Sequence, residues 1–218
     1  MNRRAFLAGA SALGLSACGA AEPVSTPQSV LSSRAYRHDG SPMLTLFTMR
    51  NTGSDRGAHT GLMINASQRV IFDPAGTFGR DVAAQSWGNL VPENMDVHYG
   101  ITPRIEEFYA RYHARLTYYV LRQDIPVTAD QAEAVLRAAV SYGAVPKTRC
   151  TIATGEILRQ APGLEWIRPT LFPDGLVEQV ATIPGVRERV IRENDSDDKT
   201  VAAANFTPEP EGAGLTSP

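Results

Sequence analysis

Hydrophobic and polar positions follow one another along the chain in patterns that predict four strands. The segments 44–49, 58–64 and 68–72 are apolar and rich in β-prone residues, which is typical of strands. The short polar stretch 65–67 separates the second segment from the third and predicts a hairpin turn. A fourth strand is expected over 116–122, where aromatic and β-branched residues gather.

Other segments have the spacing of helices. Apolar residues three and four apart predict a helix over 104–115, and a shorter helix is expected over 150–160. The clearest helix begins after Thr128, which has the spacing of a capping box with Gln131, and it ends at Gly143. Strands and helices do not alternate regularly, so the pattern favours the α+β class, with a small antiparallel sheet packed against helices.

The first residues have the pattern of an export signal. Arg3 and Arg4 precede a short apolar run that is too short to be a stable membrane span. The arginine pair resembles a twin-arginine signal, and the run ends in small residues before Cys18, which resembles a lipobox. Residues 1–17 are therefore expected to be a lipoprotein signal peptide, with lipid on Cys18 as the membrane anchor.

Composition divides the rest of the chain. Residues 18–42 are rich in Ser, Pro and Ala and predict a lipidated, flexible tether, whereas 196–218 are rich in Pro, Glu and Gly and predict a disordered tail. The folded domain is expected over 43–195. The chain has 21 basic and 23 acidic side chains, so no basic surplus points to nucleic acid, and no pattern points to an oligomeric state.

The two cysteines carry the first chemical signal. If Cys18 is lipidated, Cys150 is left without an intramolecular partner, which is unusual in an exported protein. Thr148 is placed to cap the following helix, so Cys150 is expected in its first turn, where free amides and the helix dipole favour a thiolate. A small buried hydrophobe or an intermolecular disulfide is the alternative for Cys150.

A histidine and a carboxylate complete a candidate site. His59 begins a predicted strand, and Asp73 ends the strand that returns from the hairpin turn. The hairpin brings Asp73 back towards His59, where a carboxylate can orient an imidazole base. His98 is a rival base, His113 is expected to be a solvated helix residue, and Asp73 has an alternative role as a turn residue before Pro74. No spacing of metal ligands or of a phosphate-binding loop occurs, so no metal or cofactor is expected.

These motifs resemble a known superfamily. The His59-Thr60-Gly61 strand, the Val70–Asp73 strand and the helix that begins at Cys150 are similar to those of NlpC/P60-type, papain-like enzymes. The histidine precedes the cysteine here, which resembles the circularly permuted branch that includes lecithin:retinol acyltransferase-like proteins. The resemblance implies a papain-like fold and a Cys150–His59–Asp73 triad. The chain departs from the family in having Asp as the third residue and Arg149 before the cysteine.

The pattern and the resemblance together predict a thiol hydrolase of the cell envelope. An amidase or endopeptidase acting on peptidoglycan peptides is the first expectation, in a lipoprotein that faces the periplasm from the inner or the outer membrane. A non-catalytic binding or structural lipoprotein is one alternative. An acyltransferase or thioesterase acting on lipid or ester substrates is the other.

Overall fold

A computed structural model describes residues 29, 31–32, 35–76, 78, 91–93 and 96–207. The predicted signal peptide over 1–17, the predicted lipidation site Cys18 and residues 208–218 lie outside the described residues. The strands are β1 (Met43–Asn51), β2 (Gly57–Asn65), β3 (Arg69–Phe72), β4 (Val91–Glu93), β5 (Val97–Tyr99), β6 (Tyr118–Pro126) and β7 (Arg187–Ile191). The helices are α3 (Pro103–His113), α4 (Ala129–Ser141), α5 (Cys150–Leu158), α6 (Pro173–Ala181) and α7 (Lys199–Asn205).

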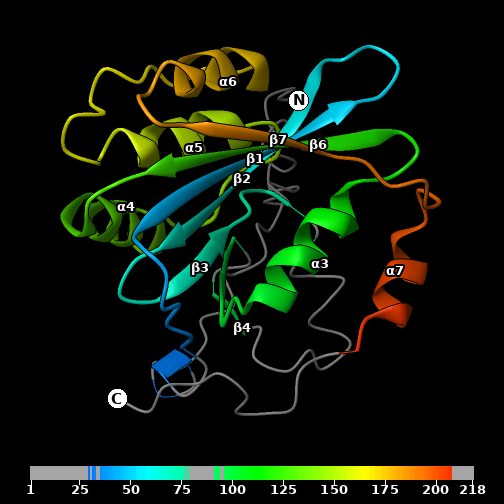
Figure 1. The fold of residues 1–218 in the computed structure, drawn as a ribbon, viewed down its shortest axis with the longest axis horizontal. Helices are drawn as coiled ribbons and strands as arrows, with labels where there is room; N and C mark the ends of the chain where they lie inside the picture. Colours follow the sequence, from blue (N-terminus) through cyan, green and yellow to red (C-terminus); the bar gives the residue numbers. More distant parts are fainter. Residues whose placement is uncertain are drawn as a thin grey trace, which may run out of the picture.

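The strands form one antiparallel sheet that runs through the centre of the molecule (Figure 1). The strand order is β4-β5-β3-β2-β1-β6-β7, and each neighbouring pair is antiparallel. The predicted α+β class is therefore confirmed. The sheet is larger than the small one predicted, with seven strands among the described residues, because the short strands β4 and β5 and the polar edge strand β7 extend it.

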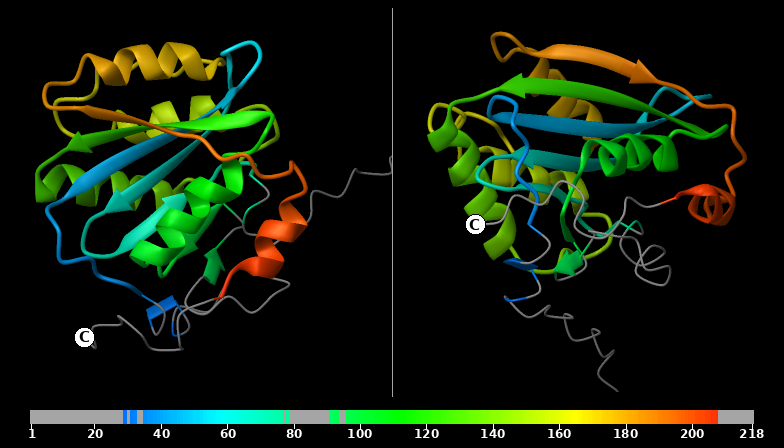
Figure 2. Two further views of the ribbon diagram at one scale, coloured as in Figure 1. Left: turned by 45° about the vertical axis from the view of Figure 1, so that its right-hand side comes forward. Right: turned by 60° about the horizontal axis from the view of Figure 1, so that its bottom comes forward.

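Helices cover both faces of the sheet and bury two separate cores. In Figure 2 helices α4, α5 and α6 lie on one side of the sheet and α3 lies on the other. Successive residues of a strand point to opposite faces. Accordingly Leu62 and Ile64 of β2 join the core under α4, α5 and α6, whereas Met63 joins the core under α3. The two faces of β2 therefore contact different cores.

The helix ends follow from local sequence. The Thr128 side chain accepts a hydrogen bond from the Gln131 N–H, and the Gln131 side chain accepts one from the Thr128 N–H, so the predicted capping box is confirmed. Gly143 follows α4 with a φ of +82°, which glycine adopts without strain. Thr102 caps α3 in the same manner by accepting from the Ile105 N–H at 3.3 Å.

The folded region extends beyond the predicted limits at both ends. Leu31 is buried in the core, and the Arg69 N–H donates to the Tyr36 carbonyl at 2.7 Å, so part of the predicted tether packs on the domain. Helix α7 lies inside the stretch 196–218, where the composition predicts disorder. Asp198 caps this helix, and the Phe206 ring packs on Phe108 at 4.3 Å, which offsets the cost of ordering the segment.

Within the described residues, none of the helices has the length and apolar character that crossing a membrane requires.

Candidate active site

Among the described residues, no strand pairs with the first half of β2 on the edge that faces β3. Strand β3 pairs only with residues 62–65 of β2, because the chain leaves the sheet after Phe72. The edge beside residues 57–61 is therefore open to the loop after β3 and to the beginning of α5. Asp73 is the first residue of that loop, and its N–H donates to the Asp96 carbonyl at 2.7 Å. The candidate site is built in this gap in the sheet.

His59 and Asp73 form a close pair, as the sequence predicts. Nε2 of His59 lies 2.8 Å from Oδ1 of Asp73, and the carboxylate is fully buried while the imidazole is 21% exposed. Burial favours the neutral imidazole, but the adjoining carboxylate overcomes this effect and raises the pKa of His59 to about 10. Burial would likewise raise the pKa of Asp73, but the charge of His59 lowers it below its usual range. Both groups are therefore charged at neutral pH.

Cys150 is the first residue of α5, at the end that faces this pair. Burial raises the pKa of its thiol, but hydrogen bonding and charge from His59 outweigh burial and lower the pKa to about 7. The hydroxyl oxygen of Thr151 lies 3.7 Å from Sγ of Cys150.

The beginning of α5 differs from the prediction in its cap. Thr148 has a φ of +74° and does not cap the helix; Arg149 occupies the N-cap position and makes no side-chain cap hydrogen bond. The turn between 146 and 149 closes through the Arg149 N–H and the Pro146 carbonyl, which places Thr148 outside the helix. The N–H of Cys150 still lies in the first turn, where the helix supplies no carbonyl acceptor.

Threonines hold α5 against β2. The Thr154 hydroxyl donates to the Cys150 carbonyl at 2.9 Å, and its oxygen lies 3.2 Å from the Thr60 hydroxyl. Thr60 follows His59 on β2 and points to the opposite face of the sheet. The helix bearing the thiol and the strand bearing the imidazole are therefore fixed to each other through a buried contact directly behind the site.

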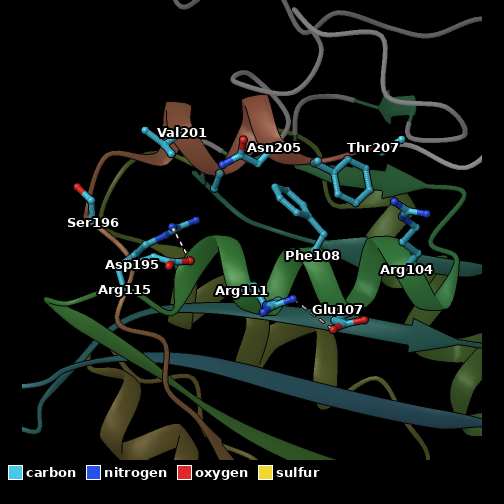
Figure 3. A pocket seen from close by; sticks show the side chains of 12 residues that line it. Arg104, Glu107, Phe108, Arg111, Arg115, Asp195, Ser196, Val201, Asn205 and Thr207 are labelled. Atoms are coloured by element: carbon cyan, nitrogen blue, oxygen red, sulfur yellow. Dashed lines mark hydrogen bonds and ion pairs between the residues drawn. The ribbon is translucent and has the colours of Figure 1, made fainter.

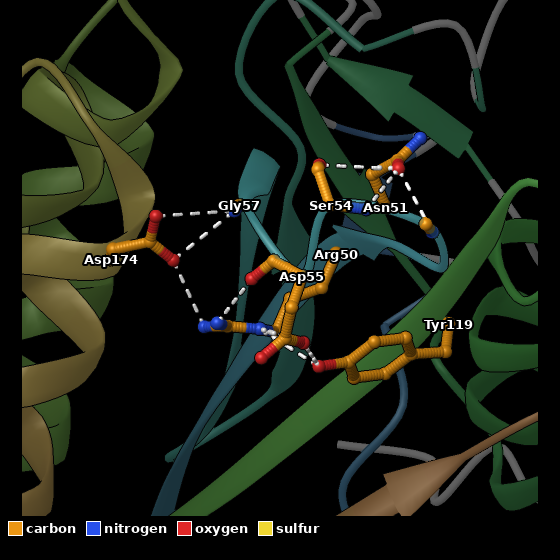
Figure 4. A network of polar contacts seen from close by, with 8 residues as sticks. Arg50, Asn51, Ser54, Asp55, Gly57, Tyr119 and Asp174 are labelled. Atoms are coloured by element: carbon orange, nitrogen blue, oxygen red, sulfur yellow. Dashed lines mark hydrogen bonds and ion pairs between the residues drawn. The ribbon is translucent and has the colours of Figure 1, made fainter.

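A second network fixes the start of β2, as Figure 4 shows. The Asp174 carboxylate of α6 accepts from the Gly57 N–H at 3.1 Å and pairs with Arg50 of β1 at 2.9 Å. A Cβ atom at Gly57 would lie 2.5 Å from Cβ of Pro173, so only glycine allows this approach. Arg50 also donates to the Tyr119 hydroxyl at 2.9 Å. The network holds the strand two residues before His59.

The other two candidate histidines are buried and neutral. Burial lowers the pKa of His98 to about 4, and neither ring nitrogen has a hydrogen-bond partner among the described residues. The prediction that His113 is solvated is wrong: it is 6% exposed, its Nδ1 donates to the Tyr109 carbonyl at 2.9 Å, and burial lowers its pKa to about 3. His113 shares the buried face of α3 with Tyr109, four residues before it. His59 is therefore the histidine coupled to the thiol.

A cavity of about 430 Å³ opens beside His59. Its walls come from β1, the start of β2, the loop after β3, the end of α3, the turn from α3 into β6 and the segment that leads into α7. The cavity reaches the imidazole rather than the Cys150 sulfur. Its lining residues are Met49, Ala58, His59, Ala75, Gly76, His113, Arg115, Thr117, Tyr118, Asp197 and Lys199.

A larger hollow of about 580 Å³ lies between α3 and α7 (Figure 3), and Arg115 lines both this hollow and the cavity beside His59. Two of the three arginines that line the hollow pair with carboxylates: Arg111 lies 3.6 Å from Glu107, and Arg115 lies 3.5 Å from Asp195. The third, Arg104, lies over the Phe206 ring at 5.6 Å. The hollow is lined by neither cysteine nor histidine. We interpret it as the seam where the last helix packs on the domain.

Tyr109 is a site residue that the sequence does not predict. Its hydroxyl donates to Asp73 Oδ1 at 2.8 Å. The apolar stripe of the helix indicates that the ring is buried, but no local pattern specifies that the hydroxyl reaches a carboxylate 36 residues earlier. Among the residues that the structure describes, no group of His, Cys, Asp and Glu has an arrangement that could hold a metal ion.

The chain matches no family model, no curated protein and no solved structure. The proposed function therefore rests on the chemistry of the site.

Proposed function

We propose that this protein is a thiol hydrolase of the cell envelope with a permuted papain-like fold, acting on an amide bond. The observation that carries the proposal is a cysteine at an uncapped helix start whose pKa is lowered to about 7 by a histidine paired with a buried carboxylate. Cysteine next to a protonated histidine is an activated nucleophile at neutral pH. A cysteine that only fills space in a core has a normal or raised pKa.

The arrangement supports a two-step reaction. The Cys150 thiolate attacks the carbonyl carbon, a C–S bond forms, and the carbonyl oxygen takes the negative charge. The N–H of Cys150 in the first turn of α5 is available to donate to that oxygen. Protonated His59 gives its proton to the leaving amine as the C–N bond breaks, which leaves an acyl group on the sulfur.

Water completes the cycle. Neutral His59 accepts a proton from a water molecule, which attacks the thioester carbon. The C–S bond breaks, the acid is released, and the thiolate and the imidazolium are restored. Asp73 stays ionised throughout and keeps Nε2 of His59 occupied, so that the other ring nitrogen, Nδ1, serves the thiol and the leaving group.

The location is inferred from the sequence pattern of the first 18 residues, and the substrate class is inferred from that location and from the resemblance to NlpC/P60-type enzymes. A lipid anchor on Cys18 would hold the domain at a membrane of the envelope, where peptidoglycan peptides supply amide bonds. One observation favours the second candidate, an acyltransferase or thioesterase: the cavity beside His59 includes apolar side chains such as Met49, Ala58 and Tyr118. Such a cavity could accept an acyl chain.

The test is acyl transfer to the cysteine itself. We would incubate the protein with peptidoglycan fragments and with a series of short and long acyl esters, and follow both product release and the intact mass. The proposal predicts turnover of an amide and a mass increase on Cys150, both abolished in Cys150→Ala. Turnover of esters alone would favour the second candidate. Turnover that persists in Cys150→Ala would contradict both.

A further inference from the structure

Two donors converge on one oxygen of the Asp73 carboxylate. Nε2 of His59 and the hydroxyl of Tyr109 each lie 2.8 Å from Oδ1. Tyr109 belongs to α3, and its side chain is fully buried between the helix and the sheet. The phenol ring is held edge-on by Phe47 at 5.2 Å and by Phe78 at 4.9 Å. The hydroxyl therefore comes from a fixed ring.

The sheet leaves space for this hydroxyl. A Cβ atom at Gly61 would lie 2.0 Å from Oη and 3.1 Å from Cζ of Tyr109. Gly61 stands two residues after His59 on β2, so it faces the same side of the sheet. The backbone conformation of Gly61 does not itself require glycine, because the glycines with positive φ among the described residues are at other positions. The absence of a side chain at this position is explained by the approach of Tyr109.

We propose that Tyr109 is a positioning residue of this site, whose hydroxyl holds the Asp73 carboxylate in the orientation that keeps His59 charged beside Cys150. The inference rests on the proposed Cys150–His59 chemistry. The last torsion of an aspartate side chain is broad, so one hydrogen bond alone defines the carboxylate plane poorly. A second donor from a rigid ring fixes the plane, and Oδ1 then stays within reach of Nε2.

The hydroxyl also has an effect on the pKa of Cys150 that opposes the effect of positioning the carboxylate. By donating to Oδ1 it withdraws negative charge from the oxygen that faces His59, which weakens the pull on the imidazolium. If this effect dominated, removing the hydroxyl would strengthen the ion pair and lower the pKa of Cys150 further. If positioning dominates, removing it raises the pKa of Cys150. The direction of the change therefore separates the two roles.

The test compares Tyr109→Phe with Tyr112→Phe in the full chain. Tyr112 is equally buried on α3 but lies under the Lys199 ammonium at 4.7 Å, so the same change there removes a hydroxyl without touching Asp73. The measured quantity is the rate of alkylation by iodoacetamide as a function of pH. We expect Tyr109→Phe to shift the profile up by about one pH unit, which lowers the rate at neutral pH about fivefold. Tyr112→Phe should keep the profile of the unmodified protein.

A downward shift or an unchanged profile in Tyr109→Phe would overturn the positioning role. The unmodified protein is the reference: if its own cysteine titrates near the free thiol value, the proposed function fails, whatever Tyr109 does. Thermal unfolding of each variant shows whether it is folded.

A second perturbation keeps the hydroxyl and displaces it. Gly61→Ala should shift the profile in the same direction as Tyr109→Phe. The pH profile of the double variant should be shifted about as far as that of Tyr109→Phe alone, because both changes act on the contact between the Tyr109 hydroxyl and Asp73. Additive shifts in the double variant would mean that Gly61 does not act through Tyr109, and would contradict the inference.

Discussion

Replacing Asp73 by asparagine removes one charge and leaves the shape of the site almost unchanged. The carboxylate is fully buried and lies 2.8 Å from Nε2 of His59. Its charge is the reason that the imidazole stays protonated, and the imidazolium is the reason that the thiol ionises early. We therefore expect Asp73→Asn to uncouple the cysteine without removing either reacting side chain.

The size of the effect follows from the fraction of thiolate. The pKa of Cys150 is lowered to about 7, so about half of the thiol is ionised at neutral pH. With a neutral amide at position 73, the pKa should return towards the free thiol value of about 8.5. About 3% of the thiol is then ionised at pH 7, so alkylation at that pH should slow roughly 15-fold.

The assay is the rate of alkylation by iodoacetamide at neutral pH and at about pH 10. At the higher pH the thiol is ionised in both proteins, so the two rates should converge. Asp96→Asn is the matched control, because Asp96 is also a buried carboxylate, but it accepts from the Ala75 N–H at 2.8 Å rather than from His59. Equal rates at neutral pH, or a deficit that persists at pH 10, would refute the coupling through Asp73.

Three further predictions concern stability. Burial lowers the pKa of His98 to about 4 and of His113 to about 3, so the unfolded chain binds more protons than the native protein as pH falls below 6.5. Stability should then fall by about 1.4 kcal/mol for each pH unit and each histidine between pH 6.5 and about pH 4. Urea unfolding of His98→Gln should show about half of this slope, and an unchanged slope would contradict the assignment. Thr128→Ala removes the cap of α4 and should lower the free energy of unfolding by about 1 kcal/mol, measured by urea unfolding, with no change in alkylation. Asp174→Asn weakens the contact to Gly57 and should cost about 1 kcal/mol in the same measurement, and no loss would show that the network does not stabilise the strand.

Local patterns predict the parts of the fold that short-range physics determines. The hairpin of β2 and β3 follows from two apolar segments around a polar turn, and α4 follows from its capping box and apolar stripe. The strand β7 is exposed and charged, so no alternation of polar and apolar residues marks it. Helix α7 has a weak pattern of its own and depends on the contact of Phe206 with Phe108. Elements of this kind form because of tertiary contacts, which a linear pattern does not contain.

The same distinction applies to the site. The pairing of His59 with Asp73 is predictable, because one hairpin sets the distance between them. The burial of His113 is missed, because the neighbouring Arg111 and Arg115 suggest a solvated helix face. The Tyr109 hydroxyl is missed for another reason: α3 must first pack on the sheet before that contact exists. The catalytic roles of Cys150, His59 and Asp73 stay predictions that follow from this geometry.

The most direct test of the central claim is the pH dependence of Cys150 alkylation in the unmodified protein, in His59→Ala and in His98→Ala. His59→Ala removes the histidine coupled to the thiol. His98→Ala makes the same change at a buried neutral histidine and serves as its control. We predict an apparent pKa of about 7 in the unmodified protein and in His98→Ala, and a value near that of a free thiol in His59→Ala. A profile unchanged in His59→Ala, or shifted only in His98→Ala, would contradict the account.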